Sequence, residues 1–170
     1  MFYMNQDNKQ EIFPIVDEDG NIINSATRGE CHSGSMLLHP VIHLHVFNSK
    51  GELYLQKRPE WKDVQPGKWD TSVGGHVDLG ESIEIALKRE AVEELGITDF
   101  IPQQLAHYIF ESTREREMVF THKTVYDGVI SPSDELDGGR FWSIKEIKAN
   151  IGKGIFTPNF EGEVERINLL

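Results

Sequence analysis

Residues 75–97, GHVDLGESIEIALKREAVEELGI, carry the strongest local pattern in the chain. Residues 82–95 within this stretch contain neither proline nor glycine and are rich in Ile, Ala, Leu, Glu and Lys, a composition that favours a helix. Gly96 follows directly, and glycine is the residue that most often ends a helix in left-handed backbone. The sequence therefore predicts a helix over 82–95 that begins after a glycine-containing loop.

The predicted helix concentrates acidic side chains on one face. Glu90, Glu93 and Glu94 are spaced i, i+3 and i+4, so their carboxylates lie close together. Like charges at this spacing destabilise a helix by roughly a few tenths of a kcal/mol per pair, and a bound divalent cation removes that penalty. Hard cations such as Mg2+ prefer carboxylate, water and phosphate oxygens. The pattern indicates a cation site.

A solvated acidic surface is the alternative interpretation of this helix face. Three apolar residues share the same side of the helix: Ile83, Ala86 and Leu87. Because apolar neighbours favour burial, the face is expected to look into a partly apolar cleft.

The complete pattern is Gly, five residues, Glu, seven residues, then Arg-Glu-apolar-x-Glu-Glu-x-Gly-apolar, and it resembles the Nudix box at every fixed position. The resemblance implies an α/β/α sandwich built on a mixed β-sheet, a fold of the α/β (α+β) class. It also implies a Mg2+-dependent hydrolase, with Mn2+ as an alternative cofactor, that cleaves a small-molecule diphosphate linked to another group.

The resemblance also implies roles for individual residues of the box. Glu90, Glu93 and Glu94 are expected to hold one or more cations that bridge the diphosphate and lower the pKa of a bound water. Arg89 is expected to orient the carboxylates by pairing with Glu81 or a neighbour. Glu94 is our choice of general base.

Length and composition limit the classes of protein to which the chain can belong. The 170 residues fit one domain, residues 1–170, with 1–10 expected to be frayed. Hydrophobic and charged fractions of 38% and 26% are typical of a soluble protein, and no apolar run approaches the ~20 residues of a membrane span. We therefore expect a cytoplasmic protein with no membrane partner.

The net charge of −11 argues against nucleic acid as a partner, because an acidic surface repels polyanions. A small phosphorylated substrate needs bound cations and local basic residues to offset this charge. The single cysteine, Cys31, excludes an internal disulfide framework. The sequence leaves the oligomeric state open.

Turn residues and apolar alternation predict the order of the other elements. Short helices are expected after Ser143, a capping box with Glu146, and from Thr157, with Pro158 at the first helical position. Strands are predicted in two hairpins, 11–17 with 21–24 and 37–47 with 52–57, and at 69–73, 105–111, 117–126 and 140–142.

From Thr27 to about Glu117 the chain also resembles the type I isopentenyl diphosphate isomerases, which share the Nudix fold. In that family two histidines seven positions apart, a histidine in the loop before the helix and a Glu-x-Glu pair hold a metal. The matching residues here are His32, His39, His76, Glu115 and Glu117. Mixed nitrogen and oxygen ligands suit Mn2+, Zn2+ or Mg2+.

The same resemblance assigns substrate contacts to Arg58 and Lys62, which match an arginine and a lysine in the loop that binds the diphosphate. A guanidinium and an ammonium both suit phosphate oxygens, whereas the alternative is two solvated loop charges. Trp69 is a third candidate, which either lines the pocket or fills the core.

One departure from the isomerases concerns the reaction itself. The family places a catalytic cysteine just before the Gly-His pair, but this chain has Gly74 there, and Cys31 lies far away in the sequence. The intact Glu93-Glu94 pair likewise favours hydrolysis. An isomerase that works without the cysteine, and a non-catalytic diphosphate-binding domain, are the alternatives.

His43 and His45 alternate with apolar residues, so they point to one face of a strand, and we interpret them as structural histidines.

The sequence leaves the substrate open. No run of residues identifies the group attached to the diphosphate. Nucleotides, dinucleotide cofactors, sugar nucleotides and isoprenoid diphosphates all remain candidates.

Overall fold

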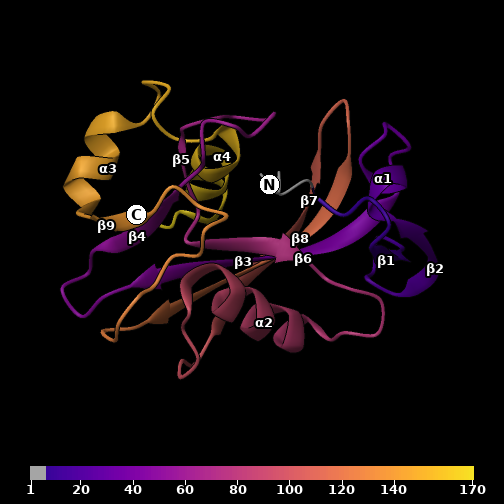
Figure 1. Ribbon diagram of the computed structural model, residues 1–170, viewed down its shortest axis with the longest axis horizontal. Coiled ribbons are helices and arrows are strands. Elements are labelled where there is room, and N and C mark those ends of the chain that lie inside the picture. Colours follow the sequence, from indigo (N-terminus) through magenta and orange to yellow (C-terminus); the bar gives the residue numbers. More distant parts are fainter. Residues whose placement is uncertain (1–6) are drawn as a thin grey trace, which may run out of the picture.

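A long strand, β3 (Leu38–Phe47), runs through the centre of a seven-stranded mixed sheet in the computed structural model, which describes residues 7–170 (Figure 1). Along its whole length β3 pairs in parallel with β8 (Arg116–Val125). Its other edge pairs antiparallel with β6 (Val73–His76) and, at its last residue, with β4 (Leu53–Lys57). The remaining strands extend the sheet: β5 (Trp69–Asp70) and β9 (Gly139–Trp142) beside β4, and β7 (Gln103–Glu111) beside β8.

Helices cover both faces of this sheet, so the predicted α/β/α arrangement on a mixed sheet is confirmed (Figure 1). On one face α2 (Ile83–Leu95) buries its apolar side against the even-numbered residues of β3. On the other face α4 (Pro158–Ile167) packs against β4, together with α3 (Ile144–Asn150). Because side chains alternate along a strand, the odd-numbered residues of β3 point towards α4.

The N-terminal residues form a separate hairpin of β1 (Ile12–Val16) and β2 (Ile22–Thr27), followed by α1 (Arg28–Cys31). Phe13 and Cys31 are fully buried there. The fraying expected of residues 1–10 stays a prediction, although the Gly29 N–H donates to the Lys9 carbonyl at 3.0 Å. Residues 1–6 lie outside the described part of the chain.

Helix ends follow the predicted chemistry closely. Ser82 caps α2 through its side chain, and Gly96 ends the helix with a φ of 65°. Thr157 caps α4, which begins at Pro158. Ser143 accepts the Glu146 N–H as predicted, but the capping box is only half formed because the Glu146 carboxylate pairs with Arg140 instead.

The predicted strand over 69–73 is wrong as a single element. It divides because residues 69–70 pair with β4 whereas residues 73–76 pair with β3. Ser72 lies at the change of partner, where its hydroxyl accepts the Val46 N–H at 2.9 Å. In the described part of the chain, none of the helices has the length and apolarity required to span a bilayer.

Candidate functional site

A pocket of about 500 Å³ lies where α2, β6, the loop after β4 and the start of α4 meet. Its acidic side is formed by Glu90, Glu93 and Glu94, referred to below as the α2 carboxylates. Arg58 and Lys62 line the same pocket from the loop. The sequence-predicted anion-binding and cation-binding residues therefore share one cavity.

The α2 carboxylates reach the pocket because β6 has no side chains in their way. A Cβ atom at Gly75 would overlap the Glu90 carboxylate, so only glycine leaves room for it there. Glu94 lies next to Glu90 and accepts a hydrogen bond from the Gln56 side chain. These contacts place both carboxylates between the helix and the sheet.

Burial changes the protonation of these two groups. It raises the pKa of Glu90 to about 7, against the opposing effect of the Arg89 charge. Burial, followed by the nearby charge of Glu90, raises the pKa of Glu94 well above its ordinary value. Both carboxyls therefore lose their protons more readily when a cation is close.

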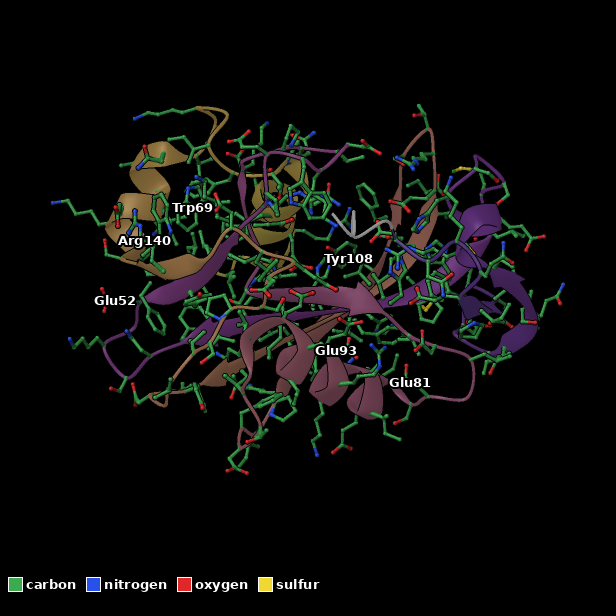
Figure 2. The ribbon with its side chains drawn as sticks, in the orientation of Figure 1. Glu52, Trp69, Glu81, Glu93, Tyr108 and Arg140 are labelled. Carbon is green, nitrogen blue, oxygen red and sulfur yellow. The ribbon has the colours of Figure 1, made fainter. Side chains whose placement is uncertain are left out.

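Arg89 lies at the centre of the ion pairs of this helix. Its Nε and Nη2 donate to both oxygens of Glu81 at 2.8 and 2.9 Å. Its Nη1 donates to Glu90 at 2.8 Å and to Glu93 at 3.2 Å. The paired geometry is bidentate on Glu81 and holds Glu90 in a fixed orientation. Figure 2 shows Glu93 on α2 and Glu81 just before the helix, at the same side of the sheet.

Two of the three predicted substrate contacts, Arg58 and Lys62, lie in the loop after β4. Arg58 donates to the Val64 carbonyl at 2.9 and 3.1 Å, and its guanidinium is 3.5 Å from Asp70. Lys62 lies 3.8 Å from Asp7. Both loop cations line the pocket.

Trp69, the third predicted contact, does not line the pocket. Its ring packs edge to face on Trp142 with centroids 5.1 Å apart, within the apolar cluster of α3 and α4. The Arg140 guanidinium carbon lies over the ring at 5.5 Å from its centroid. Figure 2 labels these two side chains near each other. These contacts favour the core alternative for Trp69, in which the indole joins β5 to β9, and its role in substrate binding stays a prediction.

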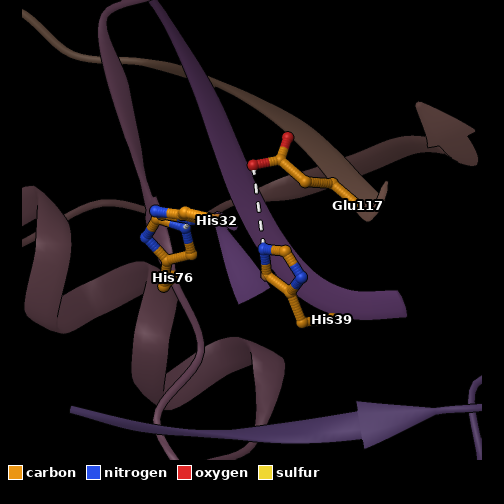
Figure 3. Close-up of side chains that lie close together, drawn as sticks. All are labelled: His32, His39, His76 and Glu117. Carbon is orange, nitrogen blue, oxygen red and sulfur yellow. Dashed lines mark hydrogen bonds and ion pairs between the residues drawn. The ribbon is translucent and has the colours of Figure 1, made fainter. Parts of the chain in front are cut away.

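Four residues of the predicted second site come together in what we call the histidine cluster: His32, His39, His76 and Glu117 (Figure 3). One ligand atom of each lies within 4.8 Å of the others. The Nε2 atoms of His32 and His76 are 3.1 Å apart, and His39 Nε2 is 4.0 Å from Glu117. Glu115, the fifth predicted member, lies beside the cluster and contacts His32 at 3.1 Å.

The cluster fits a metal ion by the chemistry of its donors. Burial lowers the pKa of His32 to about 4 and the pKa of His76 well below its ordinary value, so both imidazoles are neutral with free lone pairs. His39 Nε2 is buried and has no hydrogen-bond partner among the described residues. Two nitrogens bound to one ion at ~2.1 Å would lie about 3.0–3.4 Å apart, as His32 and His76 do.

Packing explains how residues from distant segments assemble there. The ring of Phe13, on β1, stacks on His76 with centroids 4.5 Å apart and an angle of 3°. The parallel register of β3 and β8 places His39 opposite Glu117. Sequence reasoning missed Phe13, whose only signal is its place in a strand with an apolar face.

Cys31 does not line the pocket. It is fully buried, and burial raises the pKa of its thiol to about 11. Gly74 pairs with His43 on β3 and brings no side chain to the pocket. No thiol therefore lines the pocket within residues 7–170.

Sequence reasoning also missed Gln56, Asp70 and Asn159, all of which line the pocket. Asp70 accepts a hydrogen bond from the Thr157 hydroxyl at 2.8 Å, so it joins β5 to the start of α4. Each is a single polar residue in a strand end or a helix start, and no local pattern marks such positions.

Comparisons with known proteins agree with this geometry. A family model for the NUDIX domain matches residues 37–160. An uncharacterized Nudix hydrolase of Listeria monocytogenes is 34% identical over 125 residues, 72% of this chain and 74% of the relative. An isopentenyl-diphosphate Delta-isomerase of Photorhabdus laumondii is 34% identical over 109 residues, 64% of this chain and 60% of the isomerase. A crystal structure from Deinococcus radiodurans has a TM-score of 0.79 at 25% identity and covers 92% of this chain and 99% of that protein.

Proposed function

Since this chain belongs to the Nudix domain family, we propose that it hydrolyses a diphosphate linkage in a small organic molecule, with Mg2+ as cofactor and Mn2+ as an alternative. One observation carries the proposal. The partly buried carboxylates of Glu90 and Glu94 line the same pocket as Arg58 and Lys62. A pocket with cation ligands on one side and phosphate-binding cations on the other suits a substrate that carries a diphosphate.

The residues that line the pocket have separate roles in this proposal. Arg58 and Lys62 bind phosphate oxygens and orient the substrate in the pocket. Arg89 fixes the carboxylate of Glu90 through the bonds it makes to Glu81 and Glu90. Mg2+ held by Glu90, Glu93 and Glu94 would offset the charge of the substrate and lower the pKa of the attacking water.

Glu94 is the proposed general base. Its carboxylate takes the proton of the water while the water oxygen bonds to phosphorus, and the bond from phosphorus to the bridging oxygen breaks. The electron pair of that bond stays on the leaving oxygen. Burial raises the pKa of Glu94, which makes its carboxylate a stronger proton acceptor than an exposed glutamate.

Replacing Glu94 by Gln tests this assignment. The variant keeps the size of the side chain and a partner for Gln56, so it should stay folded while Mg2+-dependent turnover falls by about a thousandfold or more. Glu84→Gln is the matched control, because Glu84 lies on the same helix with a 69% exposed side chain that pairs with Lys88. A Glu94→Gln protein that turns over at the wild-type rate would contradict the role of Glu94.

The substrate is best found with a phosphate-release screen. Nucleoside di- and triphosphates, dinucleotide cofactors, sugar nucleotides and isoprenoid diphosphates are the panel, each with Mg2+ and with Mn2+. Turnover of any member supports hydrolysis. A folded protein that binds members of the panel but releases no phosphate product supports the non-catalytic alternative.

The similarity to an isopentenyl-diphosphate Delta-isomerase favours one second candidate, isomerase activity. The isomerases place a cysteine where this chain has Gly74, so the reaction would have to use a different acid or base. Incubation with isopentenyl diphosphate, followed by NMR for the dimethylallyl isomer, decides between the two reactions.

A further inference from the structure

The odd-numbered face of β3 carries two histidines that share one carboxylate on α4. His43 Nδ1 lies 2.9 Å from Glu163 Oε1, and His45 Nε2 lies 2.6 Å from Glu163 Oε2. The Tyr108 hydroxyl donates to the same carboxylate at 2.7 Å. The Glu163 side chain is 0% exposed, so this is a buried acid whose hydrogen bonds come from three donors.

The two histidines differ in what lies on their other side. His45 is fully buried, whereas the His43 side chain is 16% exposed and lines the pocket that contains the α2 carboxylates. His43 also lines a smaller adjoining cavity of about 160 Å³. With Nδ1 bonded to Glu163, the free Nε2 edge of His43 is the part that faces these spaces.

Gly74 opens this edge of His43 to the pocket. A Cβ atom at position 74 would lie 3.5 Å from His43 Cδ2 and 3.9 Å from Nε2, in direct contact with the ring. Glycine leaves that space free. Gly74 stands where the isomerases have a cysteine, and the absence of a side chain there leaves the Nε2 edge of His43 open to the pocket.

The carboxylate that balances the charge of His43 lies in a different place from those that balance the arginines of the pocket. Burial alone would lower the pKa of His43, but the charge of Glu163 and its hydrogen bond raise it to about 9, so the ring is an imidazolium at neutral pH. Arg89 and Arg28 bind the carboxylates of Glu81 and Glu11, respectively, and Glu11 itself lines the pocket. The carboxylate bonded to His43 Nδ1 lies behind the ring, inside the protein, so Nε2 is left for the ligand space. Glu117 and Asp70, which line the pocket, add smaller contributions that also raise the pKa of His43.

We propose that His43, held by Glu163, is a substrate-binding residue that donates a charge-assisted hydrogen bond from Nε2 to an anionic phosphate oxygen in the pocket. The inference rests on the proposed function, because it takes the ligand to be a diphosphate. It assigns His43 a role that the alternation of β3 alone does not indicate. The imidazolium supplies positive charge from β3, in addition to that of Arg58 and Lys62 on the loop.

The test compares two histidine variants that both keep a donor to Glu163. His43→Asn can place its amide nitrogen near the position of Nδ1 but has no atom at Nε2. His45→Gln is the matched control, because its longer amide can reach the position of Nε2, where His45 bonds Glu163 away from the pocket. The probe is methylenediphosphonate, a diphosphate mimic that is not hydrolysed, titrated calorimetrically in the presence of Mg2+.

We expect His43→Asn to bind the probe on the order of tenfold more weakly than the wild type, and His45→Gln to bind within about twofold of it. In wild-type protein with 15N-labelled histidine, the Nε2 signal of His43 should shift when the probe is added, and that of His45 should not. The labelled wild type decides the question even if His43→Asn does not fold.

Unchanged affinity in a folded His43→Asn protein, an unmoved His43 signal, or a wild type that does not bind the probe would each overturn the inference. Its failure is distinguishable from failure of the hydrolase assignment. If the probe binds through His43 but no panel member is turned over, only the hydrolase assignment is overturned. If a panel member is turned over and Glu94→Gln abolishes that turnover, but neither the affinity of His43→Asn nor the His43 signal changes, only the role of His43 is overturned.

Discussion

The α2 carboxylates and the histidine cluster are neighbouring groups of metal-ligand type, but burial acts on them in opposite directions. Glu90 and Glu94 have raised pKa values because burial disfavours their negative charge, and Arg89 supplies part of the missing compensation. His32 and His76 have lowered pKa values because burial disfavours their positive charge. Glu90 of the first group is held by the Arg89 guanidinium, whereas the second group contains neutral imidazoles, of which His76 is held by stacking on Phe13.

The two groups therefore depend on different kinds of contact. The α2 carboxylates depend on electrostatics, so a change in charge should affect them more than a change in packing. The histidine cluster depends on the stacked ring of Phe13 and on strand register, so packing should matter more there. Four substitutions or conditions separate these expectations.

The largest effect is expected for Arg89→Met, which keeps the apolar stem but removes the charge that compensates Glu81 and Glu90. We expect a loss of about 3 kcal/mol of unfolding free energy without metal, because breaking this partly buried network of ion pairs leaves two carboxylates uncompensated. Mg2+ should restore part of it. Urea denaturation with EDTA or with Mg2+ measures both. Lys88→Met, at a 52% exposed side chain, is the control and should change stability by less than about 0.5 kcal/mol.

Equal destabilisation by Arg89→Met and Lys88→Met would contradict the view that Arg89 compensates the α2 carboxylates. Loss of stability that Mg2+ does not restore at all would show that Arg89 acts through packing instead.

The pH dependence of the metal-free protein gives the second test. With a pKa of about 4 in the folded state and 6.5 as its ordinary value, His32 binds more protons in the unfolded chain between those values, so its contribution to stability falls as pH falls. Glu90, with a folded pKa of about 7 and an ordinary value of 4.5, binds more protons when folded, so its contribution rises as pH falls.

We therefore expect opposite effects of two substitutions between pH 7 and pH 5 in EDTA. On acidification His32→Gln should lose less stability than the wild type, and Glu90→Gln should lose more, each by about 2 kcal/mol. Chemical denaturation at the two pH values measures these differences. Parallel pH profiles of the two variants would break the proposed contrast.

The order of strands and main helices along the chain could be predicted from the sequence, because the formation of each element depends on residues close to one another in the chain. Ser82, Gly96, Thr157 and Pro158 begin or end their helices as local backbone chemistry requires. The split between β5 and β6 could not be predicted, because it arises when the chain changes its pairing partner in the sheet.

The site was predictable to the extent that a spaced motif encodes it. The box places the α2 carboxylates through helix periodicity alone, and the resemblance to the isomerases placed four members of the histidine cluster correctly in space. The pairing of His43 with Glu163 joins residues 120 positions apart, and no local pattern of α4 shows which strand its buried glutamate will meet. The contact of Trp69 with Trp142 likewise joins residues that are distant in the sequence.

The third test uses the two glycines of β6, which differ in their distance from the α2 carboxylates. Gly75→Ala should cost about 2 kcal/mol, because its Cβ would overlap the Glu90 carboxylate and push it from the pocket. Gly74→Ala should cost less than about 0.5 kcal/mol, since a Cβ there meets His43 at an ordinary contact distance of 3.5 Å. Thermal denaturation of the metal-free proteins compares them. A variant at Gly75 as stable as one at Gly74 would show that α2 is free to move.

The smallest effect is expected for Phe13→Leu, which tests whether packing holds the histidine cluster. Leucine keeps the site apolar but loses the ring face that lies on His76, so we expect a loss of about 1 kcal/mol in unfolding free energy. Phe156→Leu is the control, because Phe156 is 1% exposed and packs against Trp142, remote from the cluster. Both variants lose a buried ring, but only Phe13→Leu should also reduce the stabilisation that Mn2+ gives, because only Phe13 orients a proposed ligand. Equal Mn2+ stabilisation in the two variants would mean that strand register alone positions the imidazoles.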